Sequence, residues 1–273
     1  VDPYANSVSV NGDKGYVLDI NEKSTKPIGF TNHPSPILSE KDDSIIYEMH
    51  IRDFTIDESS GVINDLRGTY LGAVEENTIY KNPYNGKYVK TGIEHLCELG
   101  ITHVHLMPIF DFGSVDERFP GSNNRNWGYD PKNFNVPEGS YCSNPYNPVT
   151  RILELRQMIM KFHERGIRVV MDMVYNHMMS TVNMDNIVPG YYFRSDYLGR
   201  YTNGSGCGNE LASERPMVRK FIIDSCLHWI KDYKIDGIRF DLMELLDIDT
   251  TKEIVKKTTK LDKNFLIYGE PWK

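Results

Sequence analysis

Beyond residue 43, hydrophobic positions follow two alternating patterns along the chain. Short apolar runs predict β-strands at residues 44–51, 101–110, 167–174, 236–243 and 265–269. Apolar residues spaced three and four apart predict helices between these runs, at residues 91–99, 150–165, 213–233 and 250–260. Gly100 and Gly166 follow the first two helices, where glycine commonly ends a helix. Strands that alternate with helices in this way indicate parallel βαβ units and therefore an α/β fold.

The chain divides into two parts by composition. Residues 1–43 are rich in Asp, Asn, Ser, Pro and Gly and show little periodicity, which predicts a linker or the tail of a preceding module. Residues 44–273 carry the five predicted strands, which fit either an open doubly wound sheet or a (β/α)8 TIM barrel of which about the first five strands are present. A barrel cut at that point leaves open edges, which predicts self-association through them.

Composition and charge exclude several classes of protein. The net charge is −7, from 31 basic and 38 acidic residues, and an acidic chain repels phosphate backbones, so no nucleic-acid partner is expected. No apolar run reaches the roughly 20 residues that span a membrane, and the N-terminus is not a signal peptide. The four cysteines form no C-x-x-C pair, so we expect free thiols and favour a cytoplasmic over a secreted protein.

Charged residues collect at the C-terminal ends of three consecutive predicted strands, where parallel α/β folds bind ligands. They are Asp172 and His177, then Arg239 and Asp241, then Glu270. Adjacent strands lie about 4.8 Å apart, and the two carboxyls of retaining glycosidases lie about 5–5.5 Å apart. Asp241 and Glu270 therefore suit glycoside hydrolysis.

The residues around these two carboxyls predict different roles for them. Arg239 lies two positions before Asp241, so both side chains point the same way, and its guanidinium is expected to keep Asp241 ionised as a nucleophile. Glu270 precedes Pro271 and Trp272. Apolar surroundings there would raise the pKa of Glu270 and suit a proton donor.

Segments around these residues resemble regions I, II and III of the α-amylase superfamily, at residues 172–177, 237–243 and 268–272. The segment at 126–131, Asn-Trp-Gly-Tyr-Asp-Pro, resembles the motif that marks type I pullulanases, with Arg125 where that motif usually has Tyr. Four more segments are similar to type I pullulanases, at residues 45–54, 102–117, 134–148 and 213–243. The resemblance covers about residues 44–273.

The resemblance implies a (β/α)8 barrel that hydrolyses α-1,6-glucosidic branches of pullulan, glycogen or amylopectin. Asp241 would be the nucleophile, Glu270 the general acid/base, and Arg239 the residue that positions Asp241. The residues that would contact the α-glucan are Asp172 and His177 at the bound sugar, Tyr129 stacked on it, and Trp127, Asp130 and His105 along the same cleft. No cofactor is expected. The third carboxylate of the family lies near the seventh strand, so we expect a truncated piece of the catalytic domain, and non-catalytic α-glucan binding is the alternative.

Two other chemistries compete with this interpretation. His103 and His105 have the H-x-H spacing of metal-dependent barrel hydrolases, but they lie on the second predicted strand rather than the first. Acidic loop residues could hold a structural Ca²⁺, although solvated carboxylates are the default expectation for Asp111, Asp116, Glu117 and Asp185. The glycine-rich stretch at 203–209 lacks the third glycine of a dinucleotide fingerprint and predicts a flexible loop.

Overall fold

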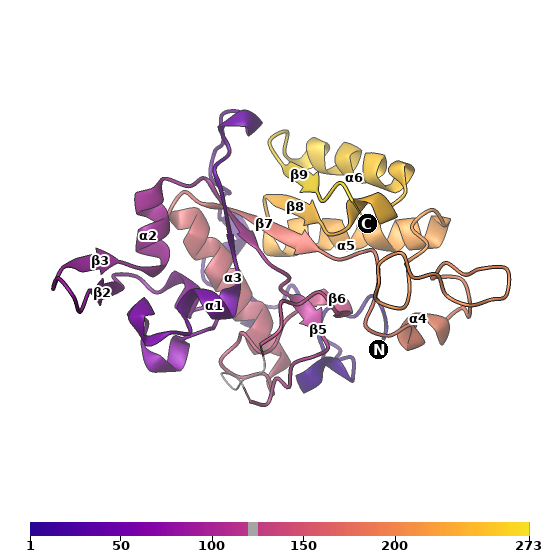
Figure 1. Cartoon of the computed structure of the whole chain (residues 1–273), viewed down its shortest axis with the longest axis horizontal. Helices are drawn as coiled ribbons and strands as arrows, with labels where there is room; N and C mark the ends of the chain where they lie inside the picture. The colour runs from indigo at the N-terminus through magenta and orange to yellow at the C-terminus, as the bar shows by residue number, and fades with distance from the viewer. Residues whose placement is uncertain (120–124, 273) are drawn as a thin grey trace.

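A parallel five-stranded sheet forms the centre of the computed structural model, which describes residues 1–119 and 125–272 (Figure 1). Its strands, in spatial order, are β1 (Ile46–Met49), β4 (His103–Leu106), β7 (Arg168–Met173), β8 (Gly237–Phe240) and β9 (Leu266–Gly269). Each strand pairs in parallel with the next. All five predicted strands are confirmed, and each is shorter than its apolar run.

The four predicted helices lie between successive strands of this sheet. They are α2 (Gly92–Leu99), α3 (Pro148–Glu164), α5 (Pro216–Tyr233) and α6 (Ile248–Leu261). The spatial order of the strands equals their order along the chain, so each crossover advances the sheet by one strand. A doubly wound sheet reverses its strand order at a switch point, whereas a (β/α) barrel advances in one direction. The structure is therefore part of a (β/α) barrel, which confirms the predicted fold class.

Shorter elements lie in the connections. They are α1 (Ile51–Thr55), the hairpin β2 (Ile79–Lys81) and β3 (Tyr88–Lys90), the antiparallel pair β5 (Phe110–Phe112) and β6 (Pro131–Pro137), and α4 (Val182–Asp185). Single turns of 3-10 helix occur at Val10–Gly12, Lys23–Thr25, Phe30–Asn32, Lys41–Asp43, Glu58–Ser60, Asn64–Leu66, Gly72–Val74 and Met243–Leu245. The pair β5 and β6 belongs to the long polar and aromatic stretch between β4 and α3, and it carries the chain across the end of the sheet (Figure 1).

The core lies between the sheet and its helices. Every residue of β7 is buried, as expected for a central parallel strand that is covered on both faces. Trp229 of α5 is fully buried, and its indole nitrogen donates a hydrogen bond of 2.9 Å to the carbonyl oxygen of Phe134 in β6. This bond attaches the loop pair β5 and β6 to the helical layer.

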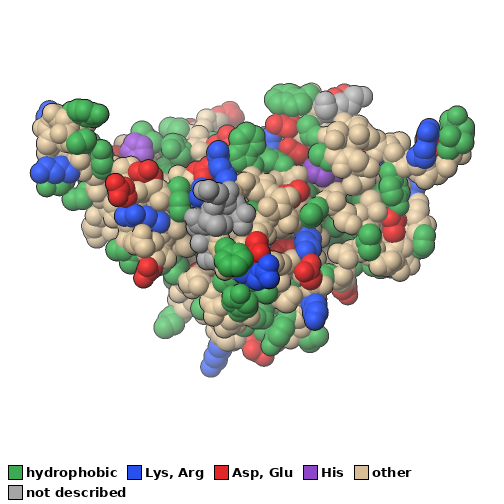
Figure 2. All heavy atoms as spheres, turned by 60° about the horizontal axis from the view of Figure 1, so that its bottom comes forward, with side chains coloured by type: hydrophobic (Ala, Val, Ile, Leu, Met, Phe, Trp, Pro, Cys, Tyr) green, Lys and Arg blue, Asp and Glu red, His purple; other side chains and the backbone are tan. Residues whose placement is uncertain are grey.

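The edges of the central sheet and the charges on one face of the molecule concern the partners expected from the sequence. Within the described residues, β1 and β9 each pair with one neighbour only, and self-association through these edges stays a prediction. Acidic and basic side chains are interspersed on the face shown in Figure 2, without a continuous basic patch. No helix in the described parts of the chain has the length and apolarity to cross a membrane. All four cysteines are free thiols, as predicted.

Residues 1–43 contain no strand of the central sheet, but they pack against α3 through one buried cation. Arg156 of α3 is 1% exposed. Its guanidinium donates hydrogen bonds to the carbonyl oxygens of Ile20 at 3.1 Å, Thr25 at 2.9 Å and Asp232 at 2.9 Å. The ring of Phe30 lies 5.3 Å from the same guanidinium. Arg156 thus joins the N-terminal segment to two helices. Lys132 and Lys234 add further hydrogen bonds to this segment, at Asn11 and Thr31.

Replacement of Arg156 by alanine should therefore loosen this segment. The change leaves buried carbonyl oxygens without donors, and each buried polar group left unsatisfied costs about 1–3 kcal/mol of the free energy of unfolding. We expect limited proteolysis to cut residues 1–43 faster in Arg156→Ala than in the parent, measured by mass spectrometry over time. Arg118→Ala, which removes an exposed pair with Asp116, is the control. Equal cleavage rates in both variants would contradict the prediction.

Candidate active site

Three neighbouring strands bring charged side chains to one end of the sheet. Asp172 in β7 lies opposite Arg239 in β8 in the parallel register, and Phe240 lies opposite Gly269 in β9. Asp241 and Glu270 are therefore the first residues after β8 and β9, at the same level. The predicted clustering of carboxylates at these strand ends is present in the structure.

The Arg239 guanidinium joins all three carboxylates. Its Nη1 lies 2.9 and 2.8 Å from the two oxygens of Asp172 and 3.4 Å from Oδ1 of Asp241. Its Nη2 forms an ion pair with Oε1 of Glu270. One cation therefore holds the side chains from three adjacent strands together, which the sequence predicted for Asp241 alone.

The backbone after Asp241 also contacts Glu270. Leu242 adopts a left-handed conformation with φ 41° and ψ 54°, which costs a non-glycine residue about 1–3 kcal/mol. In this conformation its N–H donates a hydrogen bond of 3.2 Å to Oε2 of Glu270. Strained backbone at this position thus helps to orient the second carboxyl.

The environment of the two carboxyls differs from the prediction. Burial raises the pKa of Asp241 to about 6, a hydrogen bond from Asn176 opposes this rise, and Arg239 opposes it less. Arg239 therefore limits the rise but does not keep the pKa low. The side chain of Glu270 is 23% exposed and contacts Arg239 rather than an apolar surface, and Trp272 is 55% exposed. The expected apolar shielding of Glu270 was wrong, because Arg239 reaches across to it.

Tyr129 and the two predicted histidines surround Asp172. The Tyr129 hydroxyl donates a hydrogen bond of 2.9 Å to Oδ2 of Asp172, and burial followed by the Asp172 charge raises the pKa of that hydroxyl. His105 Nε2 lies 3.3 Å from the same oxygen. His177 is buried, and its Nε2 lies 2.8 Å from the carbonyl oxygen of Tyr129, so it fixes the position of the tyrosine.

A cleft of about 570 Å³ opens beside the paired carboxyls. Asp241, Glu270, Tyr129 and Trp127 all line it, as the sequence predicted. Trp127 is 56% exposed, which leaves its ring available to a ligand. Asp130 does not line this cleft. It lines an adjoining hollow together with Trp127 and Tyr129, and it accepts a hydrogen bond of 2.8 Å from the Asn126 amide.

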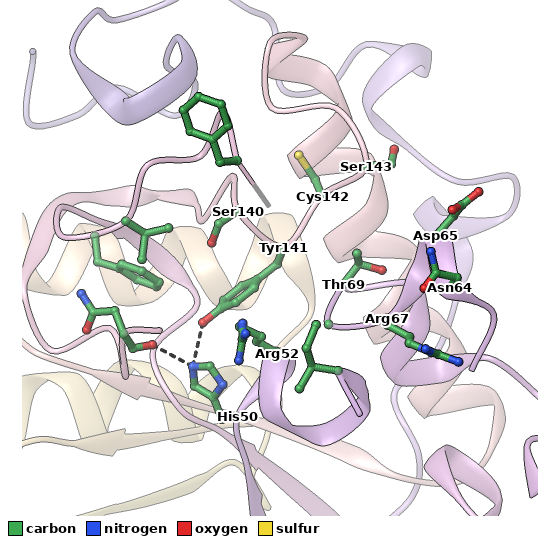
Figure 3. A pocket seen from close by; sticks show the side chains of 16 residues that line it. His50, Arg52, Asn64, Asp65, Arg67, Thr69, Ser140, Tyr141, Cys142 and Ser143 are labelled. Carbon is green, nitrogen blue, oxygen red and sulfur yellow. Dashed lines mark hydrogen bonds between the residues drawn. The ribbon is translucent and has the colours of Figure 1, made fainter. Parts of the chain in front are cut away.

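Sequence reasoning missed two residues that build this cleft. The Asn176 amide donates a hydrogen bond of 2.7 Å to Oδ2 of Asp241. Its position three residues after the end of β7 was a signal that could have identified it. His50 lines the cleft from the end of β1. Its Nε2 lies 2.8 Å from the carbonyl oxygen of Asn126 and 3.0 Å from the Tyr141 hydroxyl (Figure 3). No local pattern marks His50, since its partners lie far away in the sequence.

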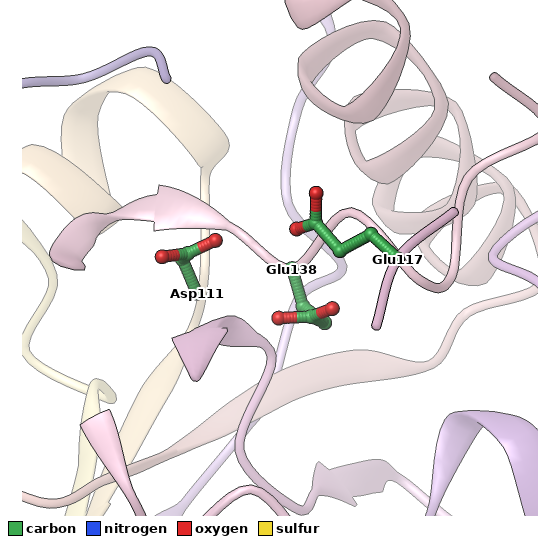
Figure 4. A group of neighbouring side chains, drawn as sticks. All are labelled: Asp111, Glu117 and Glu138. Carbon is green, nitrogen blue, oxygen red and sulfur yellow. The ribbon is translucent and has the colours of Figure 1, made fainter. Parts of the chain in front are cut away.

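A cluster of three buried carboxylates lies away from the cleft. Oxygens of Asp111, Glu117 and Glu138 lie within 4.8 Å of one another (Figure 4). The expectation of solvated loop carboxylates was wrong for Asp111 and Glu117, which are 1% exposed. Arg151 lies 3.2 Å from Asp111 Oδ1 and 2.7 Å from Glu117 Oε2. Arg151 therefore pairs with two of the three carboxylates, and Glu138 accepts hydrogen bonds from the backbone N–H groups of Phe112 and Ser140. A structural Ca²⁺ stays a prediction.

The remaining metal candidates do not come together. Asp116 forms an ion pair with Arg118, and Asp185 accepts a hydrogen bond from the Tyr201 hydroxyl. Among the described residues, neither belongs to the buried group of carboxylates. His103 is fully buried, and desolvation lowers its pKa to about 4. In the described part of the chain, the H-x-H pair does not belong to a group of three metal-ligating side chains. Residues 203–209 form turns, as predicted for a loop.

The chain is similar in sequence to one known family and to several curated proteins. The family "Alpha amylase, catalytic domain" matches residues 87–188. Pullulanase of Bacillus subtilis is 46% identical over 275 residues, which cover 100% of this chain and 36% of that protein. Isoamylase 3 of Oryza sativa subsp. japonica is 36% identical and covers 90% of this chain and 32% of its own length.

Solved structures give the same result. The structure of pullulanase from Paenibacillus barengoltzii in complex with maltohexaose and α-cyclodextrin has a TM-score of 0.93 and 47% identity, over 99% of this chain and 41% of that one. The structure of type I pullulanase from Bacillus subtilis in complex with maltose has a TM-score of 0.88 and 46% identity. The match covers 100% of this chain and 36% of that one. The chain thus spans less than half the length of the relatives it matches.

The buried cluster predicts a dependence of stability on pH. Burial raises the pKa of Asp111 to about 7 and raises the pKa of Glu138, although the Arg151 charge opposes both shifts. An aspartate in an unfolded chain has a pKa of about 3.9, so the native state binds the extra proton between about pH 4 and pH 7. Stabilisation from a raised pKa is complete below the unfolded value and is lost as the pH rises through the native value. Stability should therefore fall across this window.

Urea unfolding between pH 4 and pH 7 tests this prediction. Asp111→Asn removes the titrating group. The free energy of unfolding should therefore decrease less steeply with pH, by up to about 1.4 kcal/mol per pH unit. Asp42→Asn, at an exposed position, should leave the slope unchanged. Identical slopes in the parent and Asp111→Asn would show that Asp111 titrates normally.

Proposed function

Since the chain belongs to the pullulanase family of the α-amylase superfamily, we propose that it hydrolyses α-1,6-glucosidic linkages of pullulan, glycogen or amylopectin. The observation that carries this proposal is the arrangement of Asp241 and Glu270 on adjacent parallel strands. Both contact one guanidinium, that of Arg239, and both line one cleft. Two carboxyls facing one cleft are the requirement for a glycosidase.

The reaction follows the retaining two-carboxylate route. Asp241 attacks the anomeric carbon while Glu270 donates a proton to the glycosidic oxygen, and the bond between this carbon and oxygen breaks. Glu270 then takes a proton from water, which attacks the anomeric carbon and releases Asp241. Asn176 and Arg239 orient Asp241 for both steps through hydrogen bonds to different carboxylate oxygens.

Aromatic and polar side chains supply the contacts for an α-glucan. The Tyr129 ring lines the cleft with its hydroxyl fixed by Asp172, and Trp127 adds a second exposed ring. Flat rings of this kind pack against pyranose faces. Maltohexaose and maltose are present in the solved structures of two similar pullulanases, which supports an α-glucan as the partner.

Replacement of Asp241 by asparagine tests the proposal. The variant keeps the shape of the side chain but removes the nucleophile, so reducing-sugar release from pullulan should fall by about 10⁴-fold or more. Asp249→Asn, at an exposed position in α6, should retain the parent rate. Binding of pullulan by the parent without sugar release would favour the alternative function, non-catalytic α-glucan binding.

The pKa of Asp241 predicts the acidic limb of the pH profile. The nucleophile must be ionised, so kcat/KM should rise with pH around a midpoint of about 6. The Asn176 hydrogen bond lowers this pKa, and Asn176→Ala should move the midpoint to higher pH. Asn85→Ala, at the exposed turn between β2 and β3, serves as the control. If the midpoint of the kcat/KM profile does not move in Asn176→Ala, a group other than Asp241 controls its acidic limb.

A further inference from the structure

A second cavity lies on the other side of His50 from the catalytic cleft. It has a volume of about 520 Å³, within the range of about 300–1,000 Å³ that is typical of small-molecule sites. The segment after β1 forms one side of it, and residues 140–143, between β6 and α3, form the other (Figure 3). Neither Asp241 nor Glu270 lines this cavity, so it is distinct from the reacting centre.

The lining combines aromatic rings with neutral and charged hydrogen-bonding groups. Phe112, Phe119 and Tyr141 contribute rings. Asn64 and Asp65, in the 3-10 helix Asn64–Leu66, contribute exposed polar groups. Across the described ranges, the structure gives the side chains of these two residues no hydrogen-bond partner, so both are available to a ligand.

The charges of the lining favour a neutral ligand over an anion. Arg52 forms an ion pair of 3.2 Å with Asp53, while Arg67 and Asp65 add one charge of each sign. Burial lowers the pKa of His50, so its imidazole is neutral at pH 7. A ligand with apolar faces and many hydroxyl groups matches rings on one side and paired donors and acceptors on the other.

The wall between the cavity and the cleft is a connected set of side chains. His50 lines both spaces, and Asn126 lines the cavity and the hollow beside Tyr129. The hydrogen bonds of His50 to Tyr141 and to the Asn126 carbonyl hold this wall in place. A chain bound in the cleft therefore lies close enough for its branch or its neighbouring segment to enter the cavity.

We propose that this cavity is a second binding site for α-glucan, which holds one or two glucosyl units beside the catalytic cleft. The inference rests on the proposed function and extends it: the site would favour branched or long glucans over short linear ones. Asn64 and Asp65 would bond sugar hydroxyls, and the ring of Phe119, which is 60% exposed, would contact a pyranose face.

Affinity electrophoresis of the whole chain in pullulan gels tests this inference. The double variant Asn64→Ala/Asp65→Ala removes the two available polar groups, and the dissociation constant for pullulan should rise about fivefold to tenfold. Arg67 lines the same side of the cavity as Asn64 and Asp65, and Arg67→Ala should also raise the dissociation constant for pullulan. Asp42→Ala/Asp43→Ala changes an exposed pair in another 3-10 helix and is the matched control. Circular dichroism checks that each variant is folded.

A cleft variant separates this inference from the proposed function. Tyr129→Ala should weaken pullulan binding through the cleft. If Tyr129→Ala loses affinity while both cavity variants match the control, the second site is refuted and the proposed function stands. If the parent does not bind pullulan at all, both the second site and the proposed function are refuted. Loss of affinity in the cavity variants together with retained sugar release at saturating pullulan supports the inference.

Discussion

The active end of this barrel depends on one buried guanidinium. Asp172, Asp241 and Glu270 come from three adjacent strands, and like charges at this spacing would repel one another strongly in a partly dry cleft. Arg239 contacts all three, so their mutual repulsion is offset by attraction to a single centre. Because Arg239 lies in the strand that precedes Asp241, the register of the sheet fixes its place. The strand pairing that builds the sheet therefore also sets the position of the charge that holds the site together.

Around this centre, hydrogen bonds give each carboxyl a different environment. Asp172 is fully buried and receives Arg239 and the Tyr129 hydroxyl, which suits a residue that holds its neighbours in place. Asp241 is bonded by the Asn176 amide and remains beside the cleft. Glu270 is the most exposed of the three. This gradient of exposure separates a structural carboxylate from the two that face a substrate.

Much of the fold and most of the site could be predicted from sequence. Strand and helix positions follow from hydrophobic periodicity, and Asp241 and Glu270 follow from their positions after apolar strands. The contribution of His50 could not be predicted, because Asn126 and Tyr141 lie 76 and 91 residues away. The environments of Asp111 and Glu270 were mispredicted because burial and ion pairing depend on tertiary packing, which a local pattern does not contain.

The left-handed backbone at Leu242 couples the stability of this barrel to the orientation of a catalytic carboxyl. A leucine held at φ 41° lowers the stability of the native state, yet its N–H is one of the groups that orient Glu270. Glycine would adopt the same conformation without strain but with a more mobile chain. Leu242→Gly would keep the N–H that contacts Glu270, so relief of strain and greater freedom of the unfolded chain would oppose each other in the stability of the barrel.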